Sequence, residues 1–413
     1  MLTRRSFLTS GSKSIAAATF LPPFLQRVAS MGREGRLDGG RHGDDTIMVV
    51  IQMTGGNDGL NTVVPFGIDG YREARPTLGI SATDALPLTE SIGLHPSMTQ
   101  IHQRYQTGQV AVVQGVGYPN PNLSHFRSMD IWHTAEPDAF ETTGWLASYL
   151  ASTAVDDNNP TFAASVTDGL TPALRGGGLS IPAIAGLQQY RFRTDPQNQS
   201  DRPARLTAAD RIYHLDYRGS LLQDHVAQTA ISAISSSERV QAAAQDYSST
   251  VEYPNFPLAN SLKTVAQLIA GNLGTRIYYV AFGGFDTHSA QVANHQRLLG
   301  GFSSAVDAFL TDVAAMGKGP QTLVLAFSEF GRRVRENGSQ GTDHGTAGPM
   351  FVIGQQIAGG LYGNHPSLTD LDRNGNMVYG IDFRAVYGTV LEGWMGADQL
   401  AAMGARYENV GFV

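Results

Sequence analysis

The stretch from Arg276 to Gly345 decides the fold, and it begins with Arg276-Ile-Tyr-Tyr-Val-Ala-Phe-Gly-Gly-Phe-Asp-Thr-His288. After a helical interval come Thr322-Leu-Val-Leu-Ala-Phe-Ser-Glu-Phe-Gly-Arg332 and then Gly341-Thr-Asp-His-Gly345. The apolar, β-branched and aromatic runs at 277–282 and 323–327 predict two buried parallel strands. Acidic or histidine residues follow each run. Because ligands of open α/β sheets bind outside the carboxyl ends of the strands, we expect these side chains to share one pocket.

The residues at these strand ends are typical metal ligands. They are Asp286 with His288 and Asp343 with His344, and Glu329 is expected to support them. Carboxylates and imidazoles without a thiolate suit a catalytic zinc, manganese or magnesium ion. For any single pair, a hydrogen-bonded loop explains the residues as well. Recurrence at successive strand ends favours one shared metal site, because unrelated loop pairs have no reason to converge.

The two pairs place different demands on the backbone. Asp286 and His288 are two residues apart, so in an extended segment their side chains point the same way. Adjacent Asp343 and His344 would point apart in a strand, and they need a turn to act together. The glycines that flank this second pair are expected to supply the conformational freedom for that turn.

An earlier part of the chain repeats the pattern. Residues 46–53 predict a buried first strand, and Thr54-Gly-Gly-Asn-Asp-Gly-Leu-Asn-Thr62 is the loop at its carboxyl end. The glycines of this loop permit close backbone approach, so Asp58 is a candidate metal ligand. Plain turn chemistry explains the same Asn-Asp-Gly cluster equally well.

A further strand is predicted at 109–116, and the polar segment 117–130 follows it. Ser124 in this segment is a candidate nucleophile, although a serine at the start of a helix is also a common N-cap. The chain has no Gly-x-Ser-x-Gly elbow, which argues against an α/β-hydrolase.

The rest of the chain predicts an α/β fold with a mainly parallel central sheet and helices on both faces. From about 156 to 255 the strand pattern disappears, and 206–247 has helical spacing. We interpret 46–413 as a single domain with a largely helical insertion over the site. The remaining predicted elements are a fifth strand and four helices, at 349–354, 95–105, 265–273, 298–313 and 383–394.

Composition narrows the range of partners. The chain has 413 residues, 42% of them hydrophobic, which is enough for a large core. Four basic residues and no acidic residue lie in the first 30 positions, and the remainder has 25 basic and 36 acidic residues, a net charge of −11. This balance argues against nucleic acid or an anionic membrane as a partner. The absence of cysteine excludes thiol catalysis, disulfides and cysteine-ligated metal.

The N-terminus predicts the compartment. Thr3-Arg-Arg-Ser-Phe-Leu8 is a twin-arginine pattern, an apolar region follows at 15–25, and Val28-Ala-Ser30 has the small residues of a cleavage site. We interpret 1–30 as a twin-arginine signal peptide and 31–45 as a linker. The apolar region is too short to span a bilayer, so no stable membrane anchor is expected. The twin-arginine translocase is the expected export partner, and the periplasm or the exterior is the expected destination.

These motifs together resemble a known family. The twin-arginine start, the loop at 54–62, the Ser124-His-Phe126 segment and the motifs at 283–288, 328–332 and 341–345 are similar to exported proteins labelled domain of unknown function 1501. The resemblance covers about residue 45 to the C-terminus and includes Gln291 and His295. That family is in turn similar to the alkaline phosphatase and sulfatase superfamily.

The superfamily resemblance implies an order of site residues. The order is a ligand after the first strand, a nucleophile, an Asp with a His, and a later Asp-His pair. It matches Asp58, Ser124, Asp286 with His288 or His295, and Asp343 with His344. Thr62 competes with Ser124 for the role of nucleophile. The last histidine ligand is either His295 or His365.

The resemblance also implies a reaction, the hydrolysis of a small phosphate or sulfate ester with a divalent metal ion (zinc, magnesium, manganese or calcium). The metal would neutralise ester oxygens, and Arg127 or Arg332 would hold another. Ser124, Arg332 and Glu329 are the expected catalytic residues. The alternative is a non-catalytic exported scaffold or binding protein with a degenerate site. A third interpretation, a polysaccharide-binding protein, is compatible with the aromatic residues Tyr71, Tyr105, Tyr118 and Trp145.

Overall fold

The computed structural model describes residues 45–153, 159–191, 199–215 and 220–413. The expected signal peptide at 1–30 and residues 31–44 of the expected linker lie outside the described residues, as do parts of the expected insertion.

A central eight-stranded sheet organises the chain, in the order β10-β5-β9-β8-β1-β7-β6 with β11 paired to β5 beside that path. β1 (Ile47–Thr54) lies between β8 (Thr322–Phe327) and β7 (Ile277–Gly283) and is parallel to both. β9 (Gly348–Gly354) is antiparallel to β8 and to β5 (Val110–Gly117). The predicted mainly parallel sheet is therefore confirmed, and its five predicted strands nearly coincide with these five.

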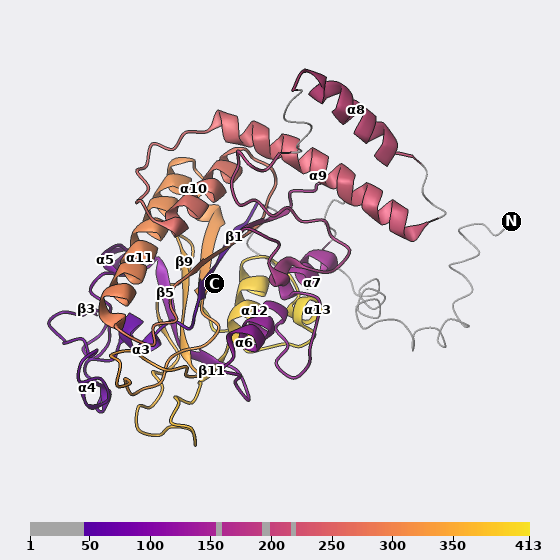
Figure 1. The fold of residues 1–413 in the computed structure, drawn as a ribbon. Helices are drawn as coiled ribbons and strands as arrows, with labels where there is room; N and C mark the ends of the chain where they lie inside the picture. Colours follow the sequence, from indigo (N-terminus) through magenta and orange to yellow (C-terminus); the bar gives the residue numbers. More distant parts are fainter. Residues whose placement is uncertain (1–44, 154–158, 192–198, 216–219) are drawn as a thin grey trace, which may run out of the picture.

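Helices cover both faces of this sheet (Figure 1). Val49, Ile51 and Met53 of β1 pack in one core, and Met48 and Val50 pack in the other. A strand buried on both faces is an almost continuous apolar run, as β1 is. The first core includes α5 (Thr99–Gln106), α10 (Pro257–Ala270) and α11 (Gln291–Ala315). The second includes α6 (His125–Thr134), α7 (Trp145–Ser152), α12 (Phe383–Gly393) and α13 (Gln399–Met403).

The parallel register brings the loops of interest to one edge of the sheet. Thr54 pairs with Gly283, and Gln52 pairs with Phe327, so β1, β7 and β8 end side by side. Since β9 is antiparallel to both β5 and β8, β5 runs in the same direction as β8. The carboxyl end of β5 therefore also lies at this edge, and it leads into α6.

The insertion differs from its predicted form in two respects. β6 (Ala163–Val166) is an edge strand parallel to β7, in a region where the sequence predicts no strand. Four small residues show too little periodicity to be recognised. The predicted helical stretch is divided into α8 (Arg202–Tyr213) and α9 (Leu221–Asp246). Figure 1 shows α9 beside α10 at one end of the molecule, with α8 outside it.

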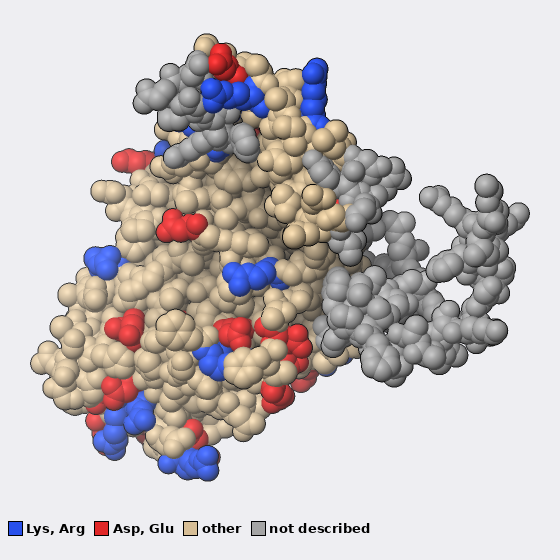
Figure 2. Space-filling model, turned by 45° about the vertical axis from the view of Figure 1, so that its right-hand side comes forward, with Lys and Arg blue, Asp and Glu red and all other residues tan. Residues whose placement is uncertain are grey.

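The remaining elements are short. They are α3 (Gly59–Thr62), α4 (Tyr71–Ala74), β10 (Gly360–Tyr362), β11 (Ile381–Asp382) and a small sheet of β2 (Val63–Val64), β4 (Gly93–Leu94) and β3 (Leu86–Pro87). Among the described residues, α11 is the one helix long and apolar enough to cross a membrane, and 61% of its most apolar window is buried inside the fold. On the face drawn in Figure 2, basic and acidic side chains are interspersed.

Candidate metal centre

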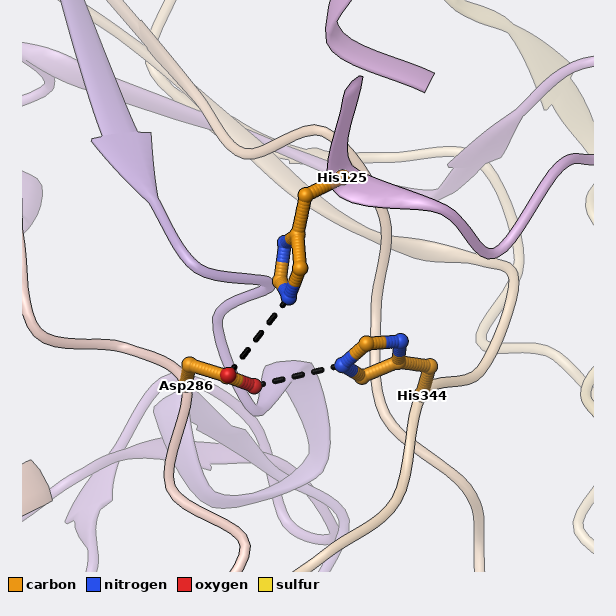
Figure 3. Close-up of side chains that lie close together, drawn as sticks. All are labelled: His125, Asp286 and His344. Atoms are coloured by element: carbon orange, nitrogen blue, oxygen red, sulfur yellow. Dashed lines mark hydrogen bonds and ion pairs between the residues drawn. The ribbon is translucent and has the colours of Figure 1, made fainter. Parts of the chain in front are cut away.

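Three side chains from distant parts of the chain meet at the carboxyl edge of the sheet (Figure 3). His125 is the first residue of α6, Asp286 follows β7, and His344 lies between β8 and β9. One ligand atom of each lies within 4.8 Å of the others. Asp286 Oδ2 is 3.5 Å from His125 Nε2, and Asp286 Oδ1 is 3.2 Å from His344 Nε2.

The other ring nitrogen of each histidine faces a hydrogen-bond acceptor. His125 Nδ1 lies 2.9 Å from Glu329 Oε1, and His344 Nδ1 lies 2.8 Å from the carbonyl oxygen of Leu123. Carbonyl and carboxylate oxygens only accept, so each Nδ1 can donate a proton to its partner. In a neutral ring with that proton on Nδ1, the Nε2 lone pair can bind a cation, and a ring protonated at both nitrogens instead donates from Nε2 to Asp286.

His288 has the same arrangement, with an acceptor beside Nδ1 and with Nε2 close to Asp286 and His344. Its Nδ1 lies 3.2 Å from Asp343 Oδ1, which also accepts from Asn337 Nδ2 at 3.1 Å. Its Nε2 lies 3.0 Å from Asp286 Oδ1 and 3.0 Å from His344 Nε2. Three imidazoles thus contact the Asp286 carboxylate, His288 and His344 at Oδ1 and His125 at Oδ2.

The converging atoms are all electron donors, and their spacing suits a metal ion. Two imidazole lone pairs 3.0 Å apart repel each other, so this spacing needs either a cation between them or a proton on one of the two nitrogens. In a tetrahedral zinc site with bonds of about 2.0–2.1 Å, neighbouring ligand atoms lie roughly 3.3 Å apart. The separations around Asp286 are 3.0, 3.2 and 3.5 Å. An outer acceptor on each Nδ1 is also typical of metal-binding histidines.

Glu329 is fully buried behind His125 and orients it. Its Oε1 accepts from the Gly55 N–H at 2.8 Å, and its carbonyl oxygen accepts from Ser128 Oγ at 2.5 Å. The hydrogen bond with Glu329 raises the pKa of His125, against the opposite effect of burial. Glu329 was predicted to be catalytic, but its burial assigns it to positioning His125, out of reach of a substrate.

Arg332 is also buried, and its N–H groups are occupied. It donates to Asp286 Oδ1 at 2.7 Å. Burial raises the pKa of Asp286, but hydrogen bonds from Arg332 and His344 outweigh this effect and lower that pKa to about 2. The remaining N–H groups donate to the carbonyl oxygens of Gly55, Gly56, Phe285 and Thr342.

These acceptors argue against the prediction that Arg332 holds an ester oxygen. Its Nε and Nη2 groups face Gly55, Gly56, Phe285 and Asp286, and its Nη1 donates to the Thr342 carbonyl oxygen and lies 3.4 Å from His288 Nε2, so an ester oxygen would have to displace one of these contacts. Arg332 instead joins the loops that carry the ligands. The alternative, Arg127, is held by Asp130 and by the carbonyl oxygens of Pro137 and Ala139.

Asp58 lies outside the cluster, which corrects its predicted role as a metal ligand. Its carboxylate is fully buried and forms a two-pronged ion pair with Arg75 at 2.6 and 3.1 Å. Gln291 donates a third hydrogen bond to it at 2.5 Å. Burial raises the pKa of Asp58, but the charge of Arg75 and the hydrogen bonds from Arg75 and Gln291 together outweigh this effect and lower the pKa to about 2. A metal ion would have to displace the guanidinium, so Asp58 is a structural carboxylate.

Asp343 also differs from its prediction as a direct ligand. It contacts Nδ1 of His288, the ring nitrogen opposite the one that faces the cluster. The hydrogen bond from Asn337 is the main reason why the pKa of Asp343 is lowered. Asp343 therefore contacts the outer side of the His288 ring, as Glu329 contacts that of the His125 ring.

The two candidate nucleophiles have different surroundings. Ser124 is exposed at the N-cap position of α6, and its side chain makes no capping hydrogen bond. Its neighbours on both sides, Leu123 and His125, contact the cluster. Thr62 is fully buried and donates to Asn57 Oδ1 at 3.0 Å. Exposure and position thus favour Ser124.

Neither candidate for a last histidine ligand reaches the cluster. His295 is buried with its Nε2 3.0 Å from Asn57 Oδ1, and burial lowers its pKa to about 3. His365 Nδ1 faces the carbonyl oxygen of Pro366 at 2.8 Å. The third imidazole of the cluster is His125, which the sequence analysis did not select. The signal for it was its position after the strand at 109–116, at the same sheet edge as the predicted ligands.

Three of the solved structures to which the chain is similar are a sulfatase, a zinc complex and Ps i-CgsB. PsFucS1 sulfatase from Pseudoalteromonas sp. has 11% identity and a TM-score of 0.36, over 95% of this chain and 77% of that one. The zinc complex of the C-terminal periplasmic domain of EcEptC from Escherichia coli has 11% identity and a TM-score of 0.34, over 77% and 75%. Ps i-CgsB has 10% identity and a TM-score of 0.36, over 88% and 73%.

No curated protein matches the chain. The family described as protein of unknown function (DUF1501) matches residues 45–402, and the chain therefore belongs to that family.

Proposed function

We propose that this protein is an exported, metal-dependent hydrolase of phosphate or sulfate esters. The observation that carries the proposal is that Nε2 of His125, His288 and His344 all contact the Asp286 carboxylate, while each Nδ1 faces an acceptor on its outer side. Histidines that bind a metal through one ring nitrogen usually donate from the other to such an acceptor. A non-catalytic exported scaffold or binding protein is the alternative.

The charge of the cluster favours a divalent cation. With neutral histidines, the three carboxylates of Asp286, Glu329 and Asp343 and the single guanidinium of Arg332 give a net charge of −2. Three imidazole nitrogens and one carboxylate suit zinc or manganese better than magnesium or calcium, which prefer oxygen ligands. When bound, such an ion would polarise an ester oxygen and lower the pKa of an attacking hydroxyl.

Ser124 supplies that hydroxyl in our proposal. It stands exposed at the start of a ten-residue helix, where the helix dipole favours the negative charge of an ester. Ser124 Oγ attacks phosphorus or sulfur, the bond to the alcohol breaks, and the hydroxyl proton ends on the departing alcohol. Water then cleaves the seryl ester and restores the serine. Glu329 holds His125 in place beside Ser124 during both steps.

Export is part of the same proposal, and the pair Arg4 and Arg5 supports it. Changing both arginines to lysine should leave full-length precursor in the cytoplasm, because the twin-arginine receptor reads that pair. Immunoblots of cell fractions would reveal the precursor. Normal processing of the double variant would contradict export through this pathway.

Metal content and ester hydrolysis, measured together, test the central proposal. Full-length protein should bind about one zinc or manganese ion and hydrolyse p-nitrophenyl phosphate or p-nitrophenyl sulfate. Ser124→Ala should retain the metal and lose hydrolysis by roughly 10³-fold or more. Ser367→Ala, a matched change of an exposed loop serine, should retain both.

Two outcomes would reject the proposal, and they differ. Protein that binds the metal but hydrolyses neither ester would favour the scaffold alternative. Protein that binds no metal would remove the basis of both the hydrolase and the metal centre. Ser124→Ala with full activity would retain the hydrolase but exclude Ser124 as its nucleophile.

A further inference from the structure

Gln291 connects the two loops that carry three of the four candidate ligands. It is the first residue of α11 and is 1% exposed. Its Oε1 accepts hydrogen bonds from Thr287 Oγ1 at 3.0 Å and from Thr342 Oγ1 at 2.6 Å. Its Nε2 donates to Asp58 Oδ2 at 2.5 Å. Two hydroxyl donors on one side and a carboxylate on the other fix the orientation of the amide.

The two threonines are next to the ligands in sequence. Thr287 lies between Asp286 and His288, and Thr342 is two residues before His344. A backbone hydrogen bond from the Thr342 N–H to the Thr287 carbonyl oxygen, 3.1 Å long, also joins the two loops. Any shift of Gln291 therefore changes the distance between ligands from different loops.

Asp58 gives Gln291 a fixed support. Its ion pair with Arg75 is fully buried, and Arg75 also donates to the carbonyl oxygens of Arg333 and Val334 at 2.8 and 2.6 Å. These two residues directly follow Arg332, which binds the ligand Asp286. The buried ion pair, Gln291 and the two ligand loops thus form one continuous hydrogen-bonded unit.

We propose that Gln291 is a positioning residue of the metal centre, which sets the separation of the 286–288 and 342–344 loops with the Asp58–Arg75 ion pair as its support. The inference rests on the proposed metal centre. It assigns a function to a buried amide that contacts neither metal nor substrate. It also makes Asp58 the support of Gln291 and not a metal ligand. Loss of a group hydrogen-bonded directly to a metal ligand typically weakens metal affinity by about 10- to 100-fold, and we take the same range for Gln291, which acts on the ligands through Thr287 and Thr342.

Zinc titration of the full-length protein against a competing chromophoric chelator tests this, together with urea unfolding in excess chelator. Gln291→Leu should weaken zinc binding by about 10- to 100-fold. Gln399→Leu is the matched control, because Gln399 is also a buried first residue of a helix and exchanges two hydrogen bonds with the backbone of Tyr407, away from the site. It should lose stability in chelator but retain wild-type zinc affinity.

Thr342→Val provides a second, milder variant that removes one hydroxyl from the unit. It should weaken zinc binding less than Gln291→Leu does, and it keeps the test decisive where Gln291→Leu does not fold. Wild-type zinc affinity in Thr342→Val and in any folded Gln291→Leu would overturn the inference. Equal losses of affinity in Gln291→Leu and Gln399→Leu would overturn it too, since general destabilisation would then suffice. Failure of wild-type protein to bind zinc would instead overturn the proposed function.

Discussion

Asp58 and Asp286 are both carboxylates with a pKa lowered to about 2, but their surroundings give them different functions. Asp58 is fully buried, and its two oxygens are used by Arg75 and Gln291. The side chain of Asp286 is 48% exposed and faces imidazole lone pairs, so it can still accept a cation. Burial and partner, rather than residue type, decide which carboxylate is structural.

The buried pair leads to a prediction about Asp58→Asn. The pKa of Asp58 is about 2 in the folded protein against an ordinary 3.8. The ionised carboxylate therefore stabilises the fold above about pH 4, and this stabilisation is lost as the pH falls toward 2. Asp58→Asn should lower the free energy of unfolding at pH 7 by about 3–5 kcal/mol, because Arg75 stays buried without its partner. Urea unfolding in chelator at pH 7, and at steps between pH 4 and 2, measures both effects.

The control is another aspartate paired with an arginine. Asp307 lies 2.7 Å from Arg104, but its side chain is 37% exposed, so Asp307→Asn should cost less than about 1 kcal/mol. Asp58→Asn that is as stable as wild type in chelator would show that Asp58 is not structural. The prediction from the sequence, a metal ligand at this position, would then be open again.

At the scale of the secondary-structure elements, the loops that carry the candidate ligands pack with their backbones in direct contact. A Cβ atom on Gly341 would lie 2.2 Å from the carbonyl carbon of His288, and one on Gly345 would lie 2.4 Å from that of Arg332. The sequence predicts that these glycines supply the conformational freedom for a turn, yet neither has a positive φ. Their function is to permit close approach of two chain segments.

Gly341→Ala should therefore separate the loops and weaken zinc affinity by about 10- to 100-fold, comparable to the loss of an outer partner of a ligand. Gly338→Ala, in the same segment, is the matched control, because its Cβ atom would have no neighbour within 4 Å. Zinc titration of both variants measures the difference. Equal affinities in the two variants would mean that the loops adjust without cost and that their close contact does not position the ligands.

The secondary structure also shows which features of the fold could be predicted from the sequence and which could not. Long apolar runs such as 47–54 predict strands because both faces of the sheet are buried, and the order of chemical groups follows from the ends of those strands. The antiparallel direction of β9 has no local signal, since it depends on pairing with two distant strands. The partner of Asp58 was not predictable either. Arg75 carries no motif, and only the tertiary fold brings it into contact.

On the scale of the whole molecule, the cluster joins segments that are far apart in sequence. His125 begins α6, Asp286 and His288 follow β7, and His344 precedes β9. An ion bound there would link the ends of three strands, and it would do so only in the folded state. Binding to the folded state alone stabilises a protein by about 2.7 kcal/mol when the free ligand is at 100 times its Kd.

Zinc should therefore raise the melting temperature of the full-length protein, and chelator should lower it again. His288→Ala should abolish most of this shift, because the variant loses a ligand at the centre of the cluster. His102→Ala should leave the shift intact, because the His102 ring contacts the carbonyl oxygen of Pro87, away from the cluster. Thermal unfolding by circular dichroism, with each variant in zinc and in chelator, provides the measurement.

Magnesium separates this prediction from a general effect of divalent charge. Three imidazole nitrogens bind magnesium poorly, so magnesium at the concentration that saturates the zinc effect should leave the melting temperature unchanged. Equal stabilisation by the two ions would point to an oxygen-rich site elsewhere, and the same shift in His288→Ala would locate it outside this cluster. A shift specific to zinc and lost with His288 requires the imidazoles to converge as they do here, because no single histidine could provide it.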